Sequence, residues 1–193
     1  MTGSGPLSGN HWEQSDNTLK YMVFENPAWD FRTFDYDKDL KFAEAKLGKT
    51  FDAFDPDLSR FRQRGGKLIL YHGWNDPSIS PLNTINYYDR VVSLLQKSGN
   101  RPQAEAQAQE FVRLFMVPGM LHCGGGPGPN SFDMLSALES WVEQKQAPER
   151  IIASHSTNGA VDRTRPLCVY PKVAVHNGRG STDEAANFVC QLR

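Results

Sequence analysis

The sequence predicts an α/β fold, in which a parallel sheet carries helices on its faces. Two short apolar stretches, Lys67–Tyr71 and Phe111–Val117, have the length and composition of buried strands. Each is followed by a loop and then by a segment with helical periodicity, at 81–97 and at 131–145. Strands that alternate with helices along the chain favour a parallel sheet whose neighbouring strands are joined by helical crossovers.

Local signals place the other elements. An apolar run at 21–24 predicts a short strand. An Asp-Pro pair at 55–56 predicts the start of a helix, which the glycine pair at 65–66 ends. Residues 103–109 are polar and alanine-rich and are expected at the surface, and the chain from residue 164 onward is expected to be irregular.

Three aspartates, Asp35, Asp37 and Asp39, alternate in the manner of a calcium-binding loop. Leu40 stands where such a loop requires glycine, so the spacing does not favour calcium. Acidic residues also stabilise the first turn of a helix. The pattern therefore predicts acidic capping of a helix over 37–47, ended by glycine at position 48.

Size and composition are those of one globular domain, with 193 residues, 39% hydrophobic residues and 11% aromatic residues. The net charge of −1 argues against a nucleic-acid partner, because no extended basic face is available. No apolar run approaches the ~20 residues that span a bilayer, so no membrane partner is expected. The first ten residues are rich in Gly and Ser and have no apolar core segment, which excludes a signal peptide within them.

The three cysteines divide into a pair and a single residue. Cys168 and Cys190 have the spacing of a loop staple near the C-terminus. Cys123 is left over beside His122, and an odd cysteine indicates an external partner or a reactive thiol. A buried free cysteine explains it equally well on composition alone.

Candidate catalytic groups lie on the two loops that follow the predicted parallel strands. Asp76 follows the first strand and His122 the second. Since the carboxyl ends of parallel strands share one edge of a sheet, the two side chains are expected to lie close together. A carboxylate that orients an imidazole is the acid and base pair of a serine hydrolase. Taken singly, Asp76 could instead cap the Asn-Asp-Pro turn, and His122 could bond to backbone in its own turn.

No serine in the chain has the setting of a nucleophile, and no Gly-x-Ser-x-Gly motif occurs. Ser4 lies in the glycine-rich lead-in, Ser78 and Ser80 follow Asp76 too closely to be aimed independently, and Ser131 suits a helix N-cap. Another hypothesis is a metal hydrolase in which the side chains at 72, 76 and 122 bind the metal ion. The spacing of these three residues is unlike that of a zinc-binding motif, so the sequence does not favour it.

Several long motifs resemble the C-terminal part of the tannase and feruloyl esterase family, which includes an enzyme that cleaves mono(hydroxyethyl) terephthalate. The resemblance extends from about residue 21 to the C-terminus. The matching stretches are Arg64-Gly-Gly-Lys-Leu-Ile-Leu-Tyr-His-Gly-Trp-Asn-Asp-Pro77, Ile79-Ser-Pro-Leu-Asn-Thr84, Tyr87-Tyr88, Phe115-Met-Val-Pro-Gly-Met-Leu-His-Cys-Gly-Gly-Gly-Pro-Gly-Pro-Asn130, Thr164-Arg-Pro-Leu-Cys168 and Ala186-Asn-Phe-Val-Cys190.

The resemblance assigns roles to several of these residues. It implies Asp76 as the acid of a catalytic triad and His122 as its base. His72 matches a position that lines the substrate pocket in relatives, although a histidine at a strand end is often structural. No cofactor and no metal are implied within the chain, because the calcium site of the family lies in a lid domain outside it.

The resemblance also implies two disulfides. Cys168 and Cys190 match the C-terminal disulfide of the family. Cys123 matches a cysteine that, in relatives, is bonded to the cysteine just before the nucleophilic serine. Such a bridge would tie the nucleophile loop to the base loop. Its partner is expected upstream, outside this chain.

The family pattern before about residue 21 has no counterpart here, which includes the nucleophile elbow, the oxyanion hole and the lid. The chain is therefore expected to be a fragment, namely the C-terminal portion of an α/β-hydrolase sheet with flanking helices. Residues 1–20 would be a flexible lead-in or a remnant of the lid-side linker, and residues 21–193 the C-terminal part of the catalytic domain. The nucleophile half and the lid domain are expected to be absent.

The expected function is the acid-and-base half of a secreted or periplasmic serine esterase that cleaves esters of aromatic acids. Without its serine, the chain alone is expected to be inactive. The alternative is a non-catalytic module that associates, through its open sheet edge, with a chain carrying the missing half.

Overall fold

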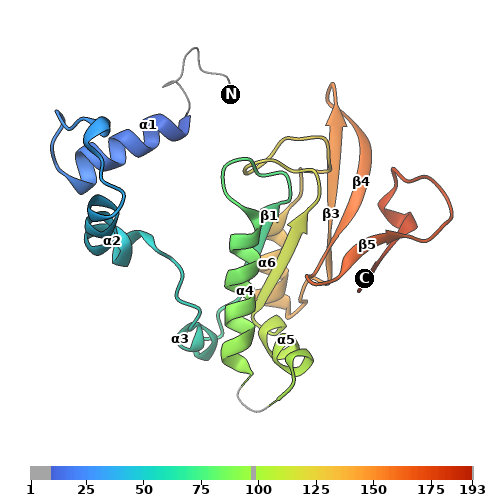
Figure 1. The fold of residues 1–193 in the computed structure, drawn as a ribbon. Coiled ribbons are helices and arrows are strands. Elements are labelled where there is room, and N and C mark those ends of the chain that lie inside the picture. The colour runs from blue at the N-terminus through green and yellow to red at the C-terminus, as the bar shows by residue number, and fades with distance from the viewer. Residues whose placement is uncertain (1–9, 97–98, 193) are drawn as a thin grey trace. The chain divides into compact units, whose positions relative to one another are not determined.

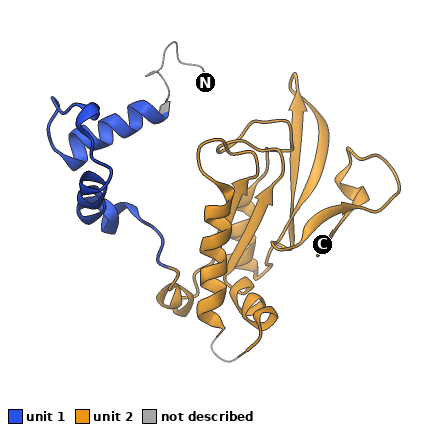
Figure 2. Cartoon of the chain, viewed as in Figure 1, with its two compact units in different colours: residues 1–55 blue, residues 56–193 orange. Residues whose placement is uncertain are grey.

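The computed structural model describes residues 10–96 and 99–192, and it divides the chain into two units, residues 1–55 and 56–193 (Figure 1, Figure 2). Each unit is described by itself. The proposed division between a lead-in over 1–20 and the remainder stays a prediction, and its first nine residues lie outside the described part of the chain.

The first unit is helical. It consists of α1 (Asn10–Asn17), the π-helix η1 (Thr18–Val23), the 3-10 helix η2 (Phe31–Thr33) and α2 (Lys38–Phe51). The strand predicted at 21–24 is wrong, because these backbone groups bond locally and the N–H of Phe24 donates to the carbonyl of Leu19. The apolar run serves packing instead, and the ring of Phe24 stacks on Trp29 at 5.0 Å between centroids.

The start of α2 confirms acidic capping. Oδ1 of Asp35 accepts hydrogen bonds from the backbone N–H groups of Lys38 and Asp37, and these bonds lower the pKa of Asp35. The helix passes through Gly48 and ends at Phe51, so glycine at 48 is not the predicted stop. A lone glycine costs a helix only about 1 kcal/mol, which the other residues of α2 can offset.

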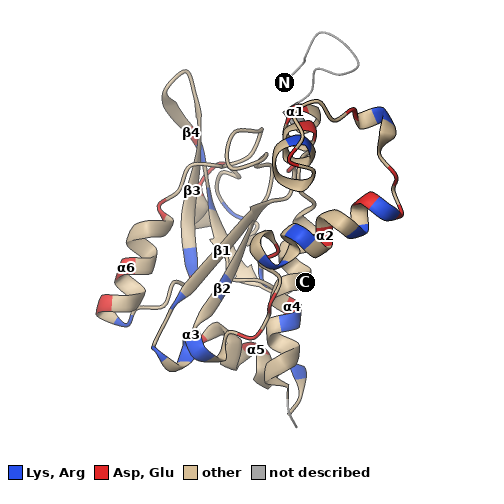
Figure 3. Ribbon diagram, turned by 90° about the vertical axis from the view of Figure 1, so that its left-hand side faces the viewer, with Lys and Arg blue, Asp and Glu red and all other residues tan. Residues whose placement is uncertain are grey.

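The second unit is organised around a parallel strand pair, as predicted. Strand β1 (Leu68–Gly73) pairs with β2 (Val112–Val117), from Leu68 opposite Val112 to Gly73 opposite Val117. The sequences of β1 and β2 contain one charged residue, Arg113, and their ribbons are correspondingly largely free of charge in Figure 3. Arg113 is buried and its charge is paired with Glu149 at 2.7 Å.

Strand β2 is buried on both faces, and its alternate side chains enter two different cores. Val112, Leu114 and Met116 join one core with helices α4 (Pro81–Leu95) and α5 (Arg101–Gln109). Phe115 and Val117 join the other core, together with residues of α6 (Met134–Gln144) and of the strands that follow it. Period-two alternation along β2 therefore produces the predicted sheet with helices on both faces.

Helical boundaries in this unit follow burial and capping. The segment expected at the surface forms α5, which buries Ala104 and Ala108, four residues apart on one face. Helix α6 begins after Asp133, whose side chain accepts from the N–H of Ser136, and not at Ser131. The short helix α3 (Ser59–Gln63) ends at the predicted glycine pair.

The segment after residue 164 is not irregular, and this expectation is wrong. Strands β3 (Arg150–Thr157) and β4 (Ala160–Cys168) form an antiparallel hairpin, and β5 (Val173–His176) pairs with β6 (Phe188–Gln191) after the 3-10 helix η3 (Ala185–Asn187). A disulfide joins Cys168 to Cys190 with 5.6 Å between their Cα atoms, which confirms this pairing.

The second edge of β1 has no strand partner within the described ranges 10–96 and 99–192. Tyr71 of β1 is 45% exposed, and Leu135 of α6 is 67% exposed. Association with another chain through this edge stays a prediction. None of the helices that the structure describes is long and apolar enough to cross a bilayer.

Candidate active site

The carboxyl ends of β1 and β2 carry two loops that are joined by backbone hydrogen bonds. The N–H of Trp74 donates to the carbonyl of Val117, and the N–H of Asn75 donates to the carbonyl of Met120, both at 3.0 Å. Each strand is thereby extended into its loop in register with its neighbour. The arrangement places Asp76 and His122, which are 46 residues apart in sequence, in direct contact.

This close approach requires glycine at the end of β1. A Cβ atom on Gly73 would lie 2.3 Å from the carbonyl oxygen of Met120 and 2.7 Å from that of Leu121. Both obstacles are backbone atoms, which cannot rotate away as a side chain can. The absent side chain therefore sets the distance between the two loops.

Replacing Gly73 with alanine should consequently destabilise the chain by about 1–3 kcal/mol, because the two loops must separate. The measurement is the free energy of unfolding from urea titration. Gly48→Ala is the control, since its Cβ would meet only the movable side chain of Asp52 at 3.1 Å within a helix, where alanine is favoured. A Gly73→Ala variant as stable as the parent would show that the close approach of the two loops does not require glycine at this position.

The carboxylate of Asp76 accepts four hydrogen bonds. Its Oδ2 lies 2.8 Å from Nδ1 of His122 and 3.1 Å from Nε2 of His72. Its Oδ1 accepts the backbone N–H groups of Ser78 at 2.8 Å and Ile79 at 3.0 Å. Burial, with only 4% of the side chain exposed, acts to raise the pKa of Asp76. The bonds from His122 and the two N–H groups outweigh burial and hold that pKa well below its usual range.

His122 presents the opposite side of its ring to solvent. Its side chain is 47% exposed, and Nδ1 donates to Asp76, which leaves Nε2 as the lone-pair nitrogen of the neutral ring. The geometry is that of an oriented base whose acceptor atom is accessible.

His72 lies behind Asp76 and is only 11% exposed. Its Nε2 faces two acceptors, Oδ2 of Asp76 at 3.1 Å and the carbonyl of Ile79 at 3.2 Å, so this nitrogen carries the hydrogen. Nδ1 then accepts from the hydroxyl of Thr84 at 2.6 Å. Both ring nitrogens are thus engaged with the protein, and contact between His72 and substrate stays a prediction.

The loop of His122 is braced by an amide that sequence reasoning did not select. Nδ2 of Asn130 donates to the carbonyl of Gly128 at 2.7 Å, and Oδ1 of Asn130 accepts the N–H of Gly125 at 3.2 Å. The backbone N–H of Asn130 donates to Ser154, which attaches the loop to β3. An asparagine that closes a run of glycines and prolines is the only sequence signal of this role.

The remaining residues that the sequence analysis considered are Cys123, three serines and a possible metal site. Cys123 is exposed and free, with a positive φ of 60°, and its pairing with a cysteine outside the chain stays a prediction. Ser131 pairs through its backbone with Ser154 and does not cap α6. Ser80 precedes α4 without a side-chain cap bond, and Ser4 lies outside the described residues. Within the described part of the chain, no group of three or more His, Cys, Asp or Glu side chains is arranged to hold a metal ion.

Comparisons with known proteins identify the family of the chain. The family model described as tannase and feruloyl esterase matches residues 5–191. An uncharacterised esterase of Xanthomonas campestris pv. campestris is 41% identical over 224 residues, which cover 98% of this chain and 38% of that protein. Mono(2-hydroxyethyl) terephthalate hydrolase of Piscinibacter sakaiensis is 47% identical over 141 residues, which cover 72% of this chain and 22% of that protein.

Solved structures of esterases also resemble the structure of this chain. Feruloyl esterase B from Aspergillus oryzae superimposes with a TM-score of 0.79 and 28% identity, over 92% of this chain and 37% of that one. A second esterase structure from the same organism gives a TM-score of 0.78 and 33% identity over the same shares. The chain therefore spans well under half the length of these proteins.

Proposed function

Because this chain belongs to the tannase and feruloyl esterase family, we propose that it supplies the acid and the base of a serine carboxylic-ester hydrolase. The observation that carries the proposal is the 2.8 Å hydrogen bond between Nδ1 of His122 and Oδ2 of Asp76. Nε2 of His122 is left accessible, as a general base requires.

In this mechanism His122 takes the proton of a serine hydroxyl as that oxygen attacks the ester carbonyl. Asp76 stabilises the imidazolium that forms, and His122 then returns the proton to the departing alkoxide. Water repeats the cycle on the acyl-enzyme. His72 and the N–H groups of Ser78 and Ile79 hold the carboxylate of Asp76 in place, so the imidazole keeps one orientation throughout.

We further propose that the attacking serine and the oxyanion-hole donors come from outside these 193 residues, so that the chain alone does not turn over. The sequence has no Gly-x-Ser-x-Gly motif, which supports this view. The relatives include a feruloyl esterase and a mono(2-hydroxyethyl) terephthalate hydrolase, which favours esters of aromatic acids as substrates. The disulfide between Cys168 and Cys190 favours an oxidising compartment, secreted or periplasmic.

A chimera tests the proposal. The segment of the Xanthomonas campestris esterase that this chain matches is replaced by this chain, and hydrolysis of methyl ferulate is followed by release of the free acid. We expect the folded chimera to hydrolyse the ester and the 193-residue chain alone to be inactive, with the intact relative as reference. A folded chimera without activity would count against esterase function, and an active 193-residue chain would contradict the external serine.

A further inference from the structure

A cleft lies in the unit formed by residues 56–193, beside the loop that carries His122. Its volume is about 530 Å³, which suits a small organic molecule. Prolines and glycines at the two ends of the loop, Pro118–Gly119 and 127–129, form one wall. Apolar side chains of β4, β5 and β6 and the two arginines Arg163 and Arg165 form the rest.

Arg165 brings a positive charge to this cleft without a carboxylate partner. Its guanidinium carbon lies 3.8 Å from the ring centroid of Phe188, and one N–H donates to the carbonyl of Thr182 at 2.5 Å. No carboxylate of the described residues lies within ion-pair distance of it. A guanidinium has five N–H donors in a planar fork, so most of them are available to a ligand. Burial first, and then the charge of Arg163, lower the pKa of Arg165, and the charge of Asp183 opposes this shift without reversing it.

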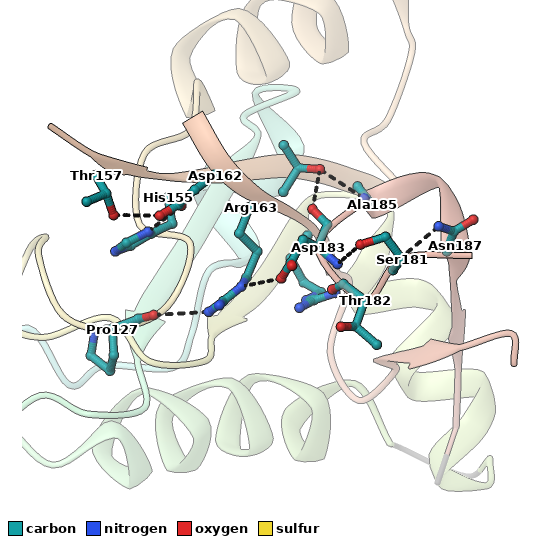
Figure 4. Close-up of polar contacts among 12 residues, drawn as sticks. Pro127, His155, Thr157, Asp162, Arg163, Ser181, Thr182, Asp183, Ala185 and Asn187 are labelled. Atoms are coloured by element: carbon teal, nitrogen blue, oxygen red, sulfur yellow. Dashed lines mark hydrogen bonds and ion pairs between the residues drawn. The ribbon is translucent and has the colours of Figure 1, made fainter. Parts of the chain in front are cut away.

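Arg163 adds a second positive charge that is already fixed in place. Its Nε donates to Oδ1 of Asp183 at 2.9 Å, and a terminal nitrogen lies 3.4 Å from the carbonyl of Pro127 (Figure 4). The nearby carboxylate of Asp162 is engaged by His155 and Thr157 on the same hairpin. Two arginines against the single Asp183 leave this part of the wall with an excess of positive charge.

We propose that this cleft binds a small organic acid, with its carboxylate on the fork of Arg165 and its apolar body against the side chains of β4 and β5. The guanidinium of Arg165, which has no carboxylate partner among the described residues, lies beside apolar side chains of β4 and β5. This combination favours a small organic acid, since a neutral molecule would leave the charge of Arg165 without a partner. Neither arginine takes part in the ester hydrolysis proposed above, so this site stands independently of it. The bound ligand would also contact the ends of the His122 loop, where the N–H of Gly128 donates to the carbonyl of Gly119 at 3.3 Å.

The test is a titration of the isotopically labelled chain with sodium benzoate, followed by amide chemical shifts. We expect saturable binding with a Kd on the order of 1 mM and shifts at Gly119, Gly128 and Ala174. Benzamide, which has the same shape without the charge, should bind about tenfold more weakly or worse. No saturation by about 50 mM benzoate, or equal binding of benzamide, would overturn the proposal.

Variants locate the site. Arg165→Gln should weaken benzoate binding by about tenfold, whereas Arg150→Gln, an exposed arginine of β3 outside the cleft, should leave it unchanged. If Arg165→Gln does not fold, Ala174→Phe decides, because it fills the cleft and leaves every charge in place. His122→Ala should bind benzoate as the parent does. Loss of binding in His122→Ala, or its retention in Arg165→Gln or in Ala174→Phe, would overturn the site.

Discussion

Replacing His122 with alanine should lower kcat for methyl ferulate in the chimera by at least about 10⁴-fold and leave KM nearly unchanged. The imidazole is the only group of the described site that can accept the serine proton, because the carboxylate of Asp76 is enclosed by four donors. Alanine removes the proton acceptor and changes no other side chain of the site. Steady-state kinetics on protein whose fold is verified by circular dichroism give both constants.

The chain offers a matched control in a second histidine–aspartate pair. Nδ1 of His155 lies 2.6 Å from Oδ1 of Asp162 on the β3–β4 hairpin, so this imidazole is oriented by its own carboxylate and not by Asp76. His155→Ala removes the same atoms and breaks the same type of contact, so it should keep the activity of the parent chimera. Full activity in His122→Ala, or loss of activity only in His155→Ala, would show that His122 is not the catalytic base.

The sheet and the contact between Asp76 and His122 could be predicted because local patterns and general topology agree. Residues 68–71 are apolar and lie between glycines at 66 and 73, and β2 is buried along its whole length, as a central strand is. Parallel strands place their carboxyl ends together, so two polar residues that each follow a strand must lie near each other. Neither inference needs a tertiary contact to be known in advance.

Other parts of the structure depend on contacts that no local pattern reveals. The run at 21–24 has the composition of a strand, but it pairs with no strand that the structure describes, and its first three residues belong to the π-helix η1. Strands β5 and β6 have four residues each and gain their stability from mutual pairing and the adjacent disulfide. A strand of four residues has too few positions for an alternation of apolar and polar side chains to be recognised in the sequence.

The surroundings of the site were the least predictable part. His72 was a candidate only through the family resemblance, and the orientation of its ring depends on Thr84, which lies on a different element. Asn130 braces the loop through bonds to backbone groups of glycines, and such bonds depend on loop conformation alone. Residue types can therefore suggest an acid and a base, whereas the groups that hold them become visible only in three dimensions.

Replacing Asp76 with asparagine should lower kcat of the chimera by about 10⁴-fold, although the side chain keeps its shape. The amide nitrogen that stands in for Oδ2 cannot accept the N–H of His122 or of His72. His122 then favours the opposite tautomer, with its hydrogen on Nε2, and this form cannot take the serine proton. An asparagine variant with parental kcat would show that Asp76 does not orient the base.

The same substitution should change the response of the 193-residue chain to acid. The folded-state pKa of Asp76 is depressed below the unfolded value of about 3.9, so its stabilising effect is complete above that pH. It is lost as the pH falls through the folded-state pKa, because protonation removes the charge that the four donors stabilise. The parent should therefore lose stability between about pH 4 and pH 2 more steeply than Asp76→Asn does.

Urea unfolding at a series of pH values measures this difference directly. Above about pH 5 the asparagine variant should be the less stable protein, and the gap should narrow as the pH falls. Asp37→Asn is the control, since Asp37 is exposed and its side chain makes no cap bond to α2, so its curve should run parallel to that of the parent. A gap that stays constant from pH 6 to pH 2 would mean that the ionised carboxylate of Asp76 is not what the four donors stabilise. In that case shape alone, and not charge, would explain how the two loops are held together.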